Sequence, residues 1–328
     1  MITRRGFLKA SLAGGVVATS PRAALQLLAT PTEPVWSTIS APLLVAGTGE
    51  TLITILHTND THSQIDPLPA NDKQYPDRGG VARRATLAKR VRKENRNTLL
   101  IDAGDVFQGT PYFNFYKGEV EYKSMSLIGY DVVTLGNHDF DNGVDALATA
   151  MKFASFDFVS SNYDVRGTPL ESRVKPYVVR VIGGVRVGLF GLGITPDNLI
   201  TPANFKGVKY TDPVKAAREV VGRLRERERC TLVVGMSHLG YYPNAREGEI
   251  GDTQVAAQVN GIDFIASGHT HTFMKQPVIT KTPGGGSTII FQVGRSGIYV
   301  GRVDLKISGG KVVASAARLL DLRDQSLG

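Results

Sequence analysis

The segment DVVTLGNHDFD, residues 131–141, decides the fold class of this chain. Its first five residues form an apolar, β-branched run, which predicts a short buried strand. The run ends at Gly136, and the next five residues include an amide, an imidazole and two carboxylates. Polar groups of this kind at the carboxyl end of a buried strand are typical of a ligand-binding edge in an α/β sheet.

The alternation of apolar run and amphipathic stretch continues on both sides of this segment, which is typical of a parallel sheet with helices on its faces. The predicted strands cover residues 52–57, 98–102, 131–135, 156–160, 185–191, 231–237 and 264–266, and the predicted helices 78–95, 119–128, 144–154 and 212–228. Glycine-rich turns at 183–184, 283–286 and 309–310 predict hairpins, the last two between strands at 278–281, 288–293, 299–307 and 312–317. We therefore expect an α/β domain over residues 51–328.

Composition excludes several classes of protein. With 42% hydrophobic and 21% charged residues, the 328-residue chain has the composition of a globular protein. No apolar run approaches the roughly 18 residues of a membrane-spanning helix, so a polytopic membrane protein is excluded and no transmembrane segment is expected. The single Cys230 excludes an intramolecular disulfide and a cysteine-rich zinc site. Any metal site must therefore use histidines and carboxylates.

The net charge of +8 raises the question of a nucleic-acid partner. Residues 1–30 contribute four basic residues and no acidic one, which leaves +4 for the rest of the chain. Most of that excess lies in the predicted helix 78–95, where basic residues surround apolar ones at helical spacing, as on a solvated helix face. Because no stretch interleaves basic and aromatic residues, we expect no nucleic-acid polymer as a partner.

The first 30 residues predict an export signal. A basic start followed by a short Gly- and Ala-rich apolar stretch is typical of a secretory signal, and TRRGFLK at residues 3–9 resembles the bacterial twin-arginine signal. A basic N-terminus before an ordinary first helix is the alternative. Residues 31–50, with three prolines, predict a linker. We therefore expect a periplasmic or secreted protein that folds before export.

Residues suited to metal binding gather after five of the predicted strands, in the groups Asn59–His62, Gly104–Asp105, Gly136–Asp139, Ser237–His238 and Gly268–His271. Each group alone is weak evidence, but the carboxyl ends of neighbouring strands meet at one edge of a sheet, so we expect the groups to converge. Imidazole nitrogen with carboxylate and amide oxygen suits Mn, Zn, Fe or Co better than Ca. Seven candidate ligands are too many for one such ion, whereas two divalent ions that share one carboxylate fit.

The order of these motifs resembles that of the calcineurin-like metallophosphoesterase superfamily. The sequences LHTND at 56–60, RGGVAR at 78–83, GDVFQG at 104–109 and GNHDFD at 136–141 narrow the resemblance to the catalytic domain of the 5'-nucleotidase and UDP-sugar hydrolase family. The resemblance covers about residues 51–321. It implies a four-layer α/β/β/α sandwich and a catalytic domain over residues 51–328.

The resemblance also implies roles for the residues that match. One metal ion would be held by Asp60, His62 and His271, the other by Asn137, His238 and His269, and Asp105 would bridge the two. A hydroxide between the ions would attack phosphorus in line. Asn137 and His138 would contact the substrate, and His138 would act as a catalytic group with Asp141 hydrogen-bonded behind it. His57 matches a family histidine that is not a ligand, and Asp139 stands where the family usually has glutamate. Asp102 is expected to accept a hydrogen bond at a strand end.

The chain departs from the family after His271, where 57 residues remain. In the family a second, C-terminal domain stacks the nucleobase and supplies arginines, so nucleoside selectivity is not carried over. We expect small phosphomonoesters as substrates, nucleotides foremost, with modest discrimination among nucleosides. Base contacts would come from a separate chain of the C-terminal type or from a predicted loop at 110–117, which is rich in aromatic residues. The alternatives are a phosphodiesterase for cyclic nucleotides or nucleotide sugars, and a noncatalytic metal-binding partner of a separate recognition chain.

Overall fold

The computed structural model describes residues 49–242 and 250–323. The predicted signal at 1–30 and all but the last two residues of the predicted linker at 31–50 lie outside the described residues. Those two segments therefore remain predictions from the sequence.

The first sheet has seven strands and is mixed. In spatial order its strands are β15 (Lys311–Asp321), β14 (Tyr299–Ser308), β1 (Thr51–Thr58), β2 (Thr98–Asp102), β3 (Val132–Thr134), β4 (Asp157–Val159) and β6 (Val174–Lys175). β1, β2, β3, β4 and β6 run parallel, whereas β14 is antiparallel to both β1 and β15. The parallel strands have apolar residues on both faces because both faces of this sheet are covered.

The second sheet has six strands and repeats this plan. Its order is β12 (Val278–Lys281), β13 (Ser287–Phe291), β11 (Phe264–Ser267), β10 (Leu232–His238), β8 (Val185–Gly193) and β7 (Tyr177–Ile182). The four central strands are parallel, and the edge strands β12 and β7 close antiparallel hairpins. A separate antiparallel pair joins β5 (Tyr163–Asp164) to β9 (Lys209–Tyr210).

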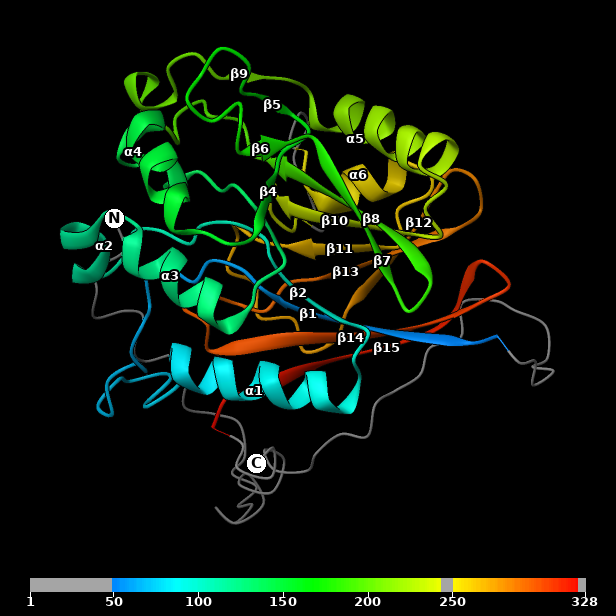
Figure 1. Ribbon diagram of the computed structural model, residues 1–328, viewed down its shortest axis with the longest axis horizontal. Helices are drawn as coiled ribbons and strands as arrows, with labels where there is room; N and C mark the ends of the chain where they lie inside the picture. Colours follow the sequence, from blue (N-terminus) through cyan, green and yellow to red (C-terminus); the bar gives the residue numbers. More distant parts are fainter. Residues whose placement is uncertain (1–48, 243–249, 324–328) are drawn as a thin grey trace, which may run out of the picture. The chain divides into compact units, whose positions relative to one another are not determined.

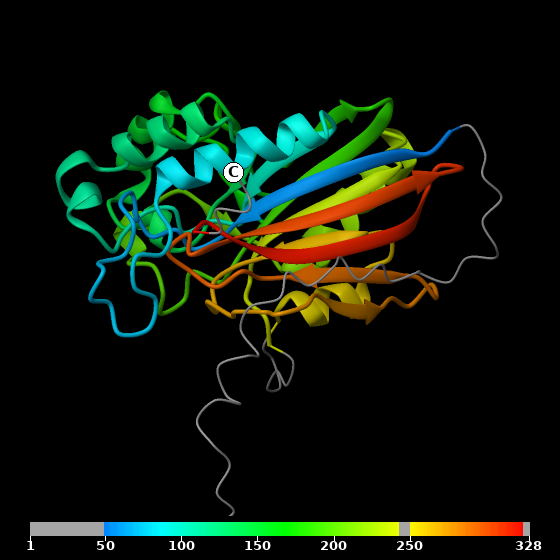
Figure 2. The same ribbon diagram turned by 90° about the horizontal axis from the view of Figure 1, so that it is seen from below.

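Helices cover the outer face of each sheet, so the domain has four layers, α/β/β/α. The helices are α1 (Val81–Glu94), α2 (Pro111–Tyr116), α3 (Glu119–Ile128), α4 (Gly143–Ala150), α5 (Pro213–Gly222) and α6 (Asp252–Gln258). Figures 1 and 2 show α1 and α3 on the side of the first sheet, and α5 and α6 on the side of the second. The four-layer sandwich predicted from the sequence is thus the observed fold.

Side-chain alternation along the strands divides the core into two clusters. In β2, Leu99 and Ile101 face the second sheet, whereas Leu100 faces the helices that cover the first sheet. This period of two is the geometry of a β-strand, in which successive side chains point to opposite faces. All three side chains are at most 2% exposed, so β2 is buried on both faces.

The helix ends differ from the sequence expectations in ways that have local causes. Helix α1 begins at Val81 rather than at residue 78, because Gly79 and Gly80 both have positive φ. Helix α5 begins after Asp212, whose carboxylate accepts a hydrogen bond from the Lys215 backbone N–H, and ends in a π-helical turn, Arg223–Arg227. Segment 110–117, expected to be a loop, contains the short helix α2, and α6 was not predicted.

Candidate active site

The predicted ligands lie at or just after the carboxyl ends of β1, β2, β3, β10 and β11: His238 is the last residue of β10, and the other six lie in the loops that follow the other four strands. These loops have unusual backbone conformations: φ is positive, between 48° and 73°, at Asp60, His62, Asp105, His269 and His271. A left-handed conformation of a non-glycine residue costs about 1–3 kcal/mol and is concentrated at functional sites. The surrounding structure therefore holds five of the seven predicted ligands in strained positions, which aims their side chains at one another.

The loops after β2 and β3 touch so closely that only glycine fits at the contact. A Cβ added at Gly136 would lie 2.1 Å from Oδ1 of Asp105, and one added at Gly104, where φ is +90°, would lie 2.6 Å from the backbone nitrogen of Gly136. The glycines before Asp105 and Asn137 therefore permit the backbone approach that brings these two side chains into one site.

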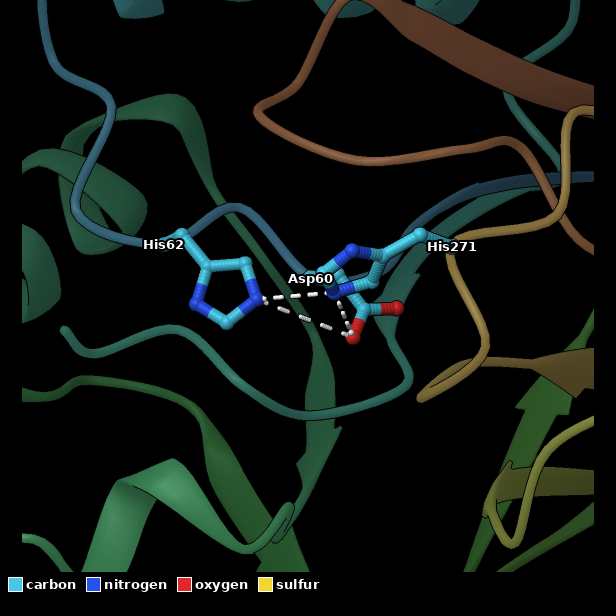
Figure 3. Close-up of side chains that lie close together, drawn as sticks. All are labelled: Asp60, His62 and His271. Carbon is cyan, nitrogen blue, oxygen red and sulfur yellow. Dashed lines mark hydrogen bonds and ion pairs between the residues drawn. The ribbon is translucent and has the colours of Figure 1, made fainter. Parts of the chain in front are cut away.

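The first group of converging side chains is Asp60, His62 and His271, shown in Figure 3. The Nε2 atoms of His62 and His271 are 3.0 Å apart, and Oδ1 of Asp60 lies 3.3 Å from His271 Nε2 and 4.0 Å from His62 Nε2. The three side chains come from two loops and point toward a common centre. Two imidazoles and a carboxylate arranged in this way can hold a divalent transition-metal ion.

The second group is Asp105, His238 and His269, with Asn137 beside it. Oδ2 of Asp105 lies 3.1 Å from His238 Nε2, and Oδ1 of Asn137 lies 3.0 Å from His269 Nδ1. His238 Nε2 is also 3.9 Å from Oδ1 of Asp60, so the two groups adjoin. The structure therefore brings all seven predicted ligands together as two adjacent groups.

Hydrogen bonds behind the imidazoles orient their free nitrogens toward the centre. Nδ1 of His238 lies 2.7 Å from the carbonyl oxygen of Ala103, and Nδ1 of His62 lies 3.2 Å from that of Phe107. A carbonyl oxygen can only accept a hydrogen bond, so Nδ1 of each histidine carries the proton. Nε2 of each histidine can therefore offer a lone pair to a metal ion. Ligand histidines in metalloproteins are held in this way, and the donor set therefore fits a metal ion.

The electrostatics of the second group also favour a cation. Burial disfavours a charged His238, but Asp105 outweighs this effect and raises the pKa of His238 to about 10. Burial also opposes the charged form of Asp105, yet the nearby histidines bring the pKa of Asp105 well below its ordinary value. A divalent ion would take the place of the His238 proton, because ligand histidines must be neutral. In contrast, burial lowers the pKa of His269 to about 4, which leaves it ready to ligate.

His138 is placed differently from the predicted ligands. Its Nδ1 lies 3.0 Å from Oδ2 of Asp141, and its backbone N–H donates to Oδ1 of Asp105 over 2.8 Å. The hydrogen bond to Asp141 raises the pKa of His138, although partial burial opposes this effect. The imidazole is about one-third exposed, at 36%, so it can meet a substrate while its protonated form is stabilised.

Asp139 has a role that sequence reasoning missed. Its buried carboxylate accepts hydrogen bonds from the backbone N–H groups of Gly136, Asp105 and Val106, at 2.8, 3.2 and 3.1 Å. Burial and then the charge of Asp105 raise the pKa of Asp139 to about 7. It therefore ties the Asp105 loop to the Asn137 loop. The signals in the sequence were its position beside His138 and its match to a family glutamate, and neither indicated these hydrogen bonds.

Two other residues near the ligands are buried but do not face the site. Asp102 accepts hydrogen bonds from Thr58 Oγ1 over 2.5 Å and from the Gly104 backbone N–H over 2.9 Å. His57 is fully buried between the sheets, and neither ring nitrogen has a hydrogen-bond partner among the described residues. It makes edge contacts with the rings of Phe264 and Phe291, at centroid distances of 5.5 and 5.4 Å.

A cavity of about 560 Å³ opens beside the converging groups. The residues that line it include His62, His138 and His271, together with Tyr75 and Arg295. This volume lies within the range of pockets that bind small molecules.

The aromatic residues at 110–117 lie away from this cavity. Phe113 is buried and stacks on Phe107 at a centroid distance of 5.0 Å, so it belongs to the core. Tyr112, Phe115 and Tyr116 line a second cavity of about 550 Å³, which shares Gln64 with the first. The segment thus offers exposed rings next to the candidate active site rather than inside it.

The fold and the converging histidines and carboxylates define the class of protein as a phosphoesterase-type α/β/β/α sandwich. Residues 53–273 match the family model described as calcineurin-like phosphoesterase, and the chain belongs to that family.

Among proteins of known function, the chain is 32% identical over 286 residues to the 5'-nucleotidase of Rattus norvegicus, covering 80% of this chain and 48% of the relative. It is 31% identical over 293 residues to a trifunctional nucleotide phosphoesterase of Bacillus subtilis, covering 80% of this chain and 18% of the relative. Among solved structures, a 5'-nucleotidase precursor from Thermus thermophilus aligns with a TM-score of 0.73 and 34% identity, over 83% of this chain and 54% of that one. The chain therefore spans about half or less of the length of these relatives.

Proposed function

We propose that this chain is a metal-dependent phosphomonoesterase that acts on small phosphate esters, with nucleotides as the main substrate class. The observation that carries this proposal is the convergence of two ligand groups with the His138–Asp141 pair at one cavity. The 5'-nucleotidases among the relatives support nucleotides as substrates.

The proposed metal ligands are the seven residues predicted from the sequence. Asp60, His62 and His271 would hold one divalent ion, Asn137, His238 and His269 a second, and Asp105 would bridge them. Bound ions of this kind act as Lewis acids on phosphoryl oxygens and make a coordinated water acidic. Mn, Zn, Fe or Co suits this donor set.

His138 and Asp141 supply the acid chemistry in this proposal. Asp141 fixes the His138 ring through Nδ1, which leaves Nε2 free to donate to the substrate. A protonated Nε2 can stabilise charge on a phosphoryl oxygen or give its proton to the leaving oxygen. The Asp105 carboxylate accepts a hydrogen bond from the His138 backbone N–H. This bond holds His138, the proposed acid, at a fixed place relative to the second ligand group.

Two alternatives share parts of the site. A phosphodiesterase for cyclic nucleotides or nucleotide sugars would use the same ligands. A noncatalytic metal-binding partner of a recognition chain would not need His138 to be charged, whereas Asp141 raises the pKa of His138 here. The geometry therefore favours an enzyme.

A single assay separates these functions. Purified protein is freed of metal with a chelator and reconstituted with Mn²⁺, Zn²⁺ or Co²⁺, and hydrolysis of 4-nitrophenyl phosphate and bis-4-nitrophenyl phosphate is compared. We expect metal-dependent activity, with the monoester preferred. Preference for the diester would favour the phosphodiesterase, and inactivity on both substrates with bound metal would favour the binding protein.

Export is a separate part of the proposal. The twin-arginine motif at residues 3–9 supports a periplasmic or secreted location, and among the described residues no helix is long and apolar enough to cross a membrane. Replacing Arg4 and Arg5 together by lysine should keep the protein in the cytoplasm. Normal export of that variant would contradict twin-arginine transport.

A further inference from the structure

The loop 294–298 enters the 560 Å³ cavity and is tied to the ligand loops. The Ser296 backbone N–H donates to the carbonyl oxygen of Asp60 over 2.7 Å, and the Gly294 N–H donates to that of Thr272 over 3.0 Å. The Asn59 amide closes the base of the loop, because its Nδ2 donates to the Gly294 carbonyl over 2.6 Å. The backbone on both sides of Arg295 is therefore fixed relative to the first ligand group.

Arg295 is the residue that this loop presents to the cavity. Its side chain is exposed, and its guanidinium has no hydrogen bond or ion pair among the residues that the structure describes. An arginine held on a fixed backbone beside a ligand group, with its five N–H donors uncommitted, is suited to an oxyanion. Such a contact would be formed only when a substrate fills the cavity.

The charges around Arg295 also favour an anion. Lys73 is a second cation in the lining, and Asp72 is the one carboxylate among the residues that line the cavity. Asp72 already accepts the backbone N–H groups of Gln74 and Tyr75, at 2.9 and 2.6 Å. Besides these hydrogen bonds, Arg295 itself is among the groups that lower the pKa of Asp72. The residues that line the cavity therefore carry two cations and one carboxylate, a net charge of +1 when the histidines are neutral.

We propose that Arg295, assisted by Lys73, binds a second phosphate on the leaving group of the substrate and so selects esters and anhydrides that carry two phosphates. This inference rests on the proposed phosphoesterase function, because it places the first phosphate at the ligand groups. The reaction is ordinary hydrolysis: water oxygen bonds to the first phosphorus, the bond from that phosphorus to the leaving oxygen breaks, and the leaving group departs with its phosphate on Arg295. The leaving oxygen or the solvent takes the water proton.

The test compares Arg295→Gln with the wild-type protein on three substrates. A nucleoside 5'-diphosphate places the second phosphate next to the first, a hexose 1,6-bisphosphate places it farther away, and 4-nitrophenyl phosphate has none. Arg227→Gln is the matched control, because Arg227 is exposed and precedes β10, whereas His238 ends that strand on the opposite edge of the sheet. Arg295→Lys tests whether charge alone suffices.

We expect Arg295→Gln to lower kcat/KM about 10- to 100-fold on at least one of the two-phosphate substrates, as for loss of a charge-assisted hydrogen bond. The same variant should change 4-nitrophenyl phosphate hydrolysis less than about twofold, and Arg227→Gln should change neither. The affected substrate identifies the spacing of the phosphates. Equal losses on all three substrates would mean that Arg295 acts on the transferred phosphoryl group, and no loss on any would mean that it binds nothing; either result overturns the proposal.

A binding measurement keeps this test independent of catalysis. Calorimetric titration with inorganic pyrophosphate and orthophosphate should show that Arg295→Gln weakens pyrophosphate binding about 10-fold or more and leaves orthophosphate binding unchanged. Chelation of metal by pyrophosphate affects all variants alike, so only ratios between variants are compared. If the wild-type protein hydrolyses none of the three substrates, the proposed function fails, and the pyrophosphate ratio still decides whether the anion site exists.

Discussion

Replacing His57 by leucine should make the stability of the protein less dependent on pH. The His57 ring lies between Phe264 and Phe291 with no hydrogen-bond partner for either nitrogen among the described residues. Burial therefore lowers its pKa from the ordinary 6.5 to about 3. Leucine has a similar volume but no group that can bind a proton.

The expected magnitude comes from the difference between the folded and unfolded pKa values. At pH ~7.5 and above, His57 is almost entirely uncharged in both states, so it adds little pH dependence. As the pH falls below 6.5, the unfolded chain binds a proton that the folded chain cannot bind, and the free energy of unfolding decreases until the pH approaches 3. At pH ~5.5 the loss amounts to about 1.4 kcal/mol, and below pH ~3 to roughly 5 kcal/mol.

Urea unfolding followed by circular dichroism at pH ~7.5 and ~5.5 measures this loss. A chelator is present throughout, because metal binding has its own pH dependence. Other histidines titrate in both proteins, so the quantity compared is the change in unfolding free energy between the two pH values. Any effect of the substitution on the unfolding free energy that is the same at both pH values cancels in this comparison. We expect the wild-type protein to lose about 1.4 kcal/mol more than His57→Leu. An equal loss in both proteins would refute the argument that His57 is held uncharged.

Three further substitutions, and a control for the third, test the site and the core. Asp105→Asn should reduce the metal content of the reconstituted protein, as measured by elemental analysis, because Asp105 is the proposed shared ligand; full metal content would contradict that assignment. His138→Gln should retain its metal yet lower kcat by about 10²- to 10⁴-fold, and loss of metal or unchanged kcat would each contradict the acid role. Gly301→Ala should destabilise the fold by about 1–3 kcal/mol, because the added Cβ would lie 2.0 Å from Nε2 of His57. Gly222→Ala is the control, because nothing lies within 4 Å of the added carbon, and it should be neutral or stabilising. Thermal unfolding of both variants and the wild-type protein measures these effects.

Most of the strands could be predicted from the sequence because buried strands carry local signals. The run TLLID at 98–102 has the same bounds in the structure as β2, and the parallel arrangement follows from its alternation with helices. The short helices α2 and α6, of six and seven residues, escaped prediction. Helices of this length span less than two full turns, so the sequence shows too little helical periodicity to predict them. Their formation depends on packing against the rest of the fold.

The sequence alone determined where candidate ligands gather, since a strand end followed by Asp, Asn or His is a local pattern and the topology of an α/β sheet brings such ends to one edge. The choice of seven ligands within these groups came from the resemblance of the motifs to a known family, and it remains a prediction. Only the tertiary structure decided how these residues meet. The carbonyl groups behind His62 and His238 belong to residues that are 45 and 135 positions away in the chain, and Asp139 accepts a hydrogen bond from Asp105, 34 positions away. The position of Arg295 was decided in the same way, because its loop is fixed by hydrogen bonds to residues near positions 60 and 272. Contacts between distant segments leave no periodicity in the chain, so the fold alone reveals which charged groups share a cavity.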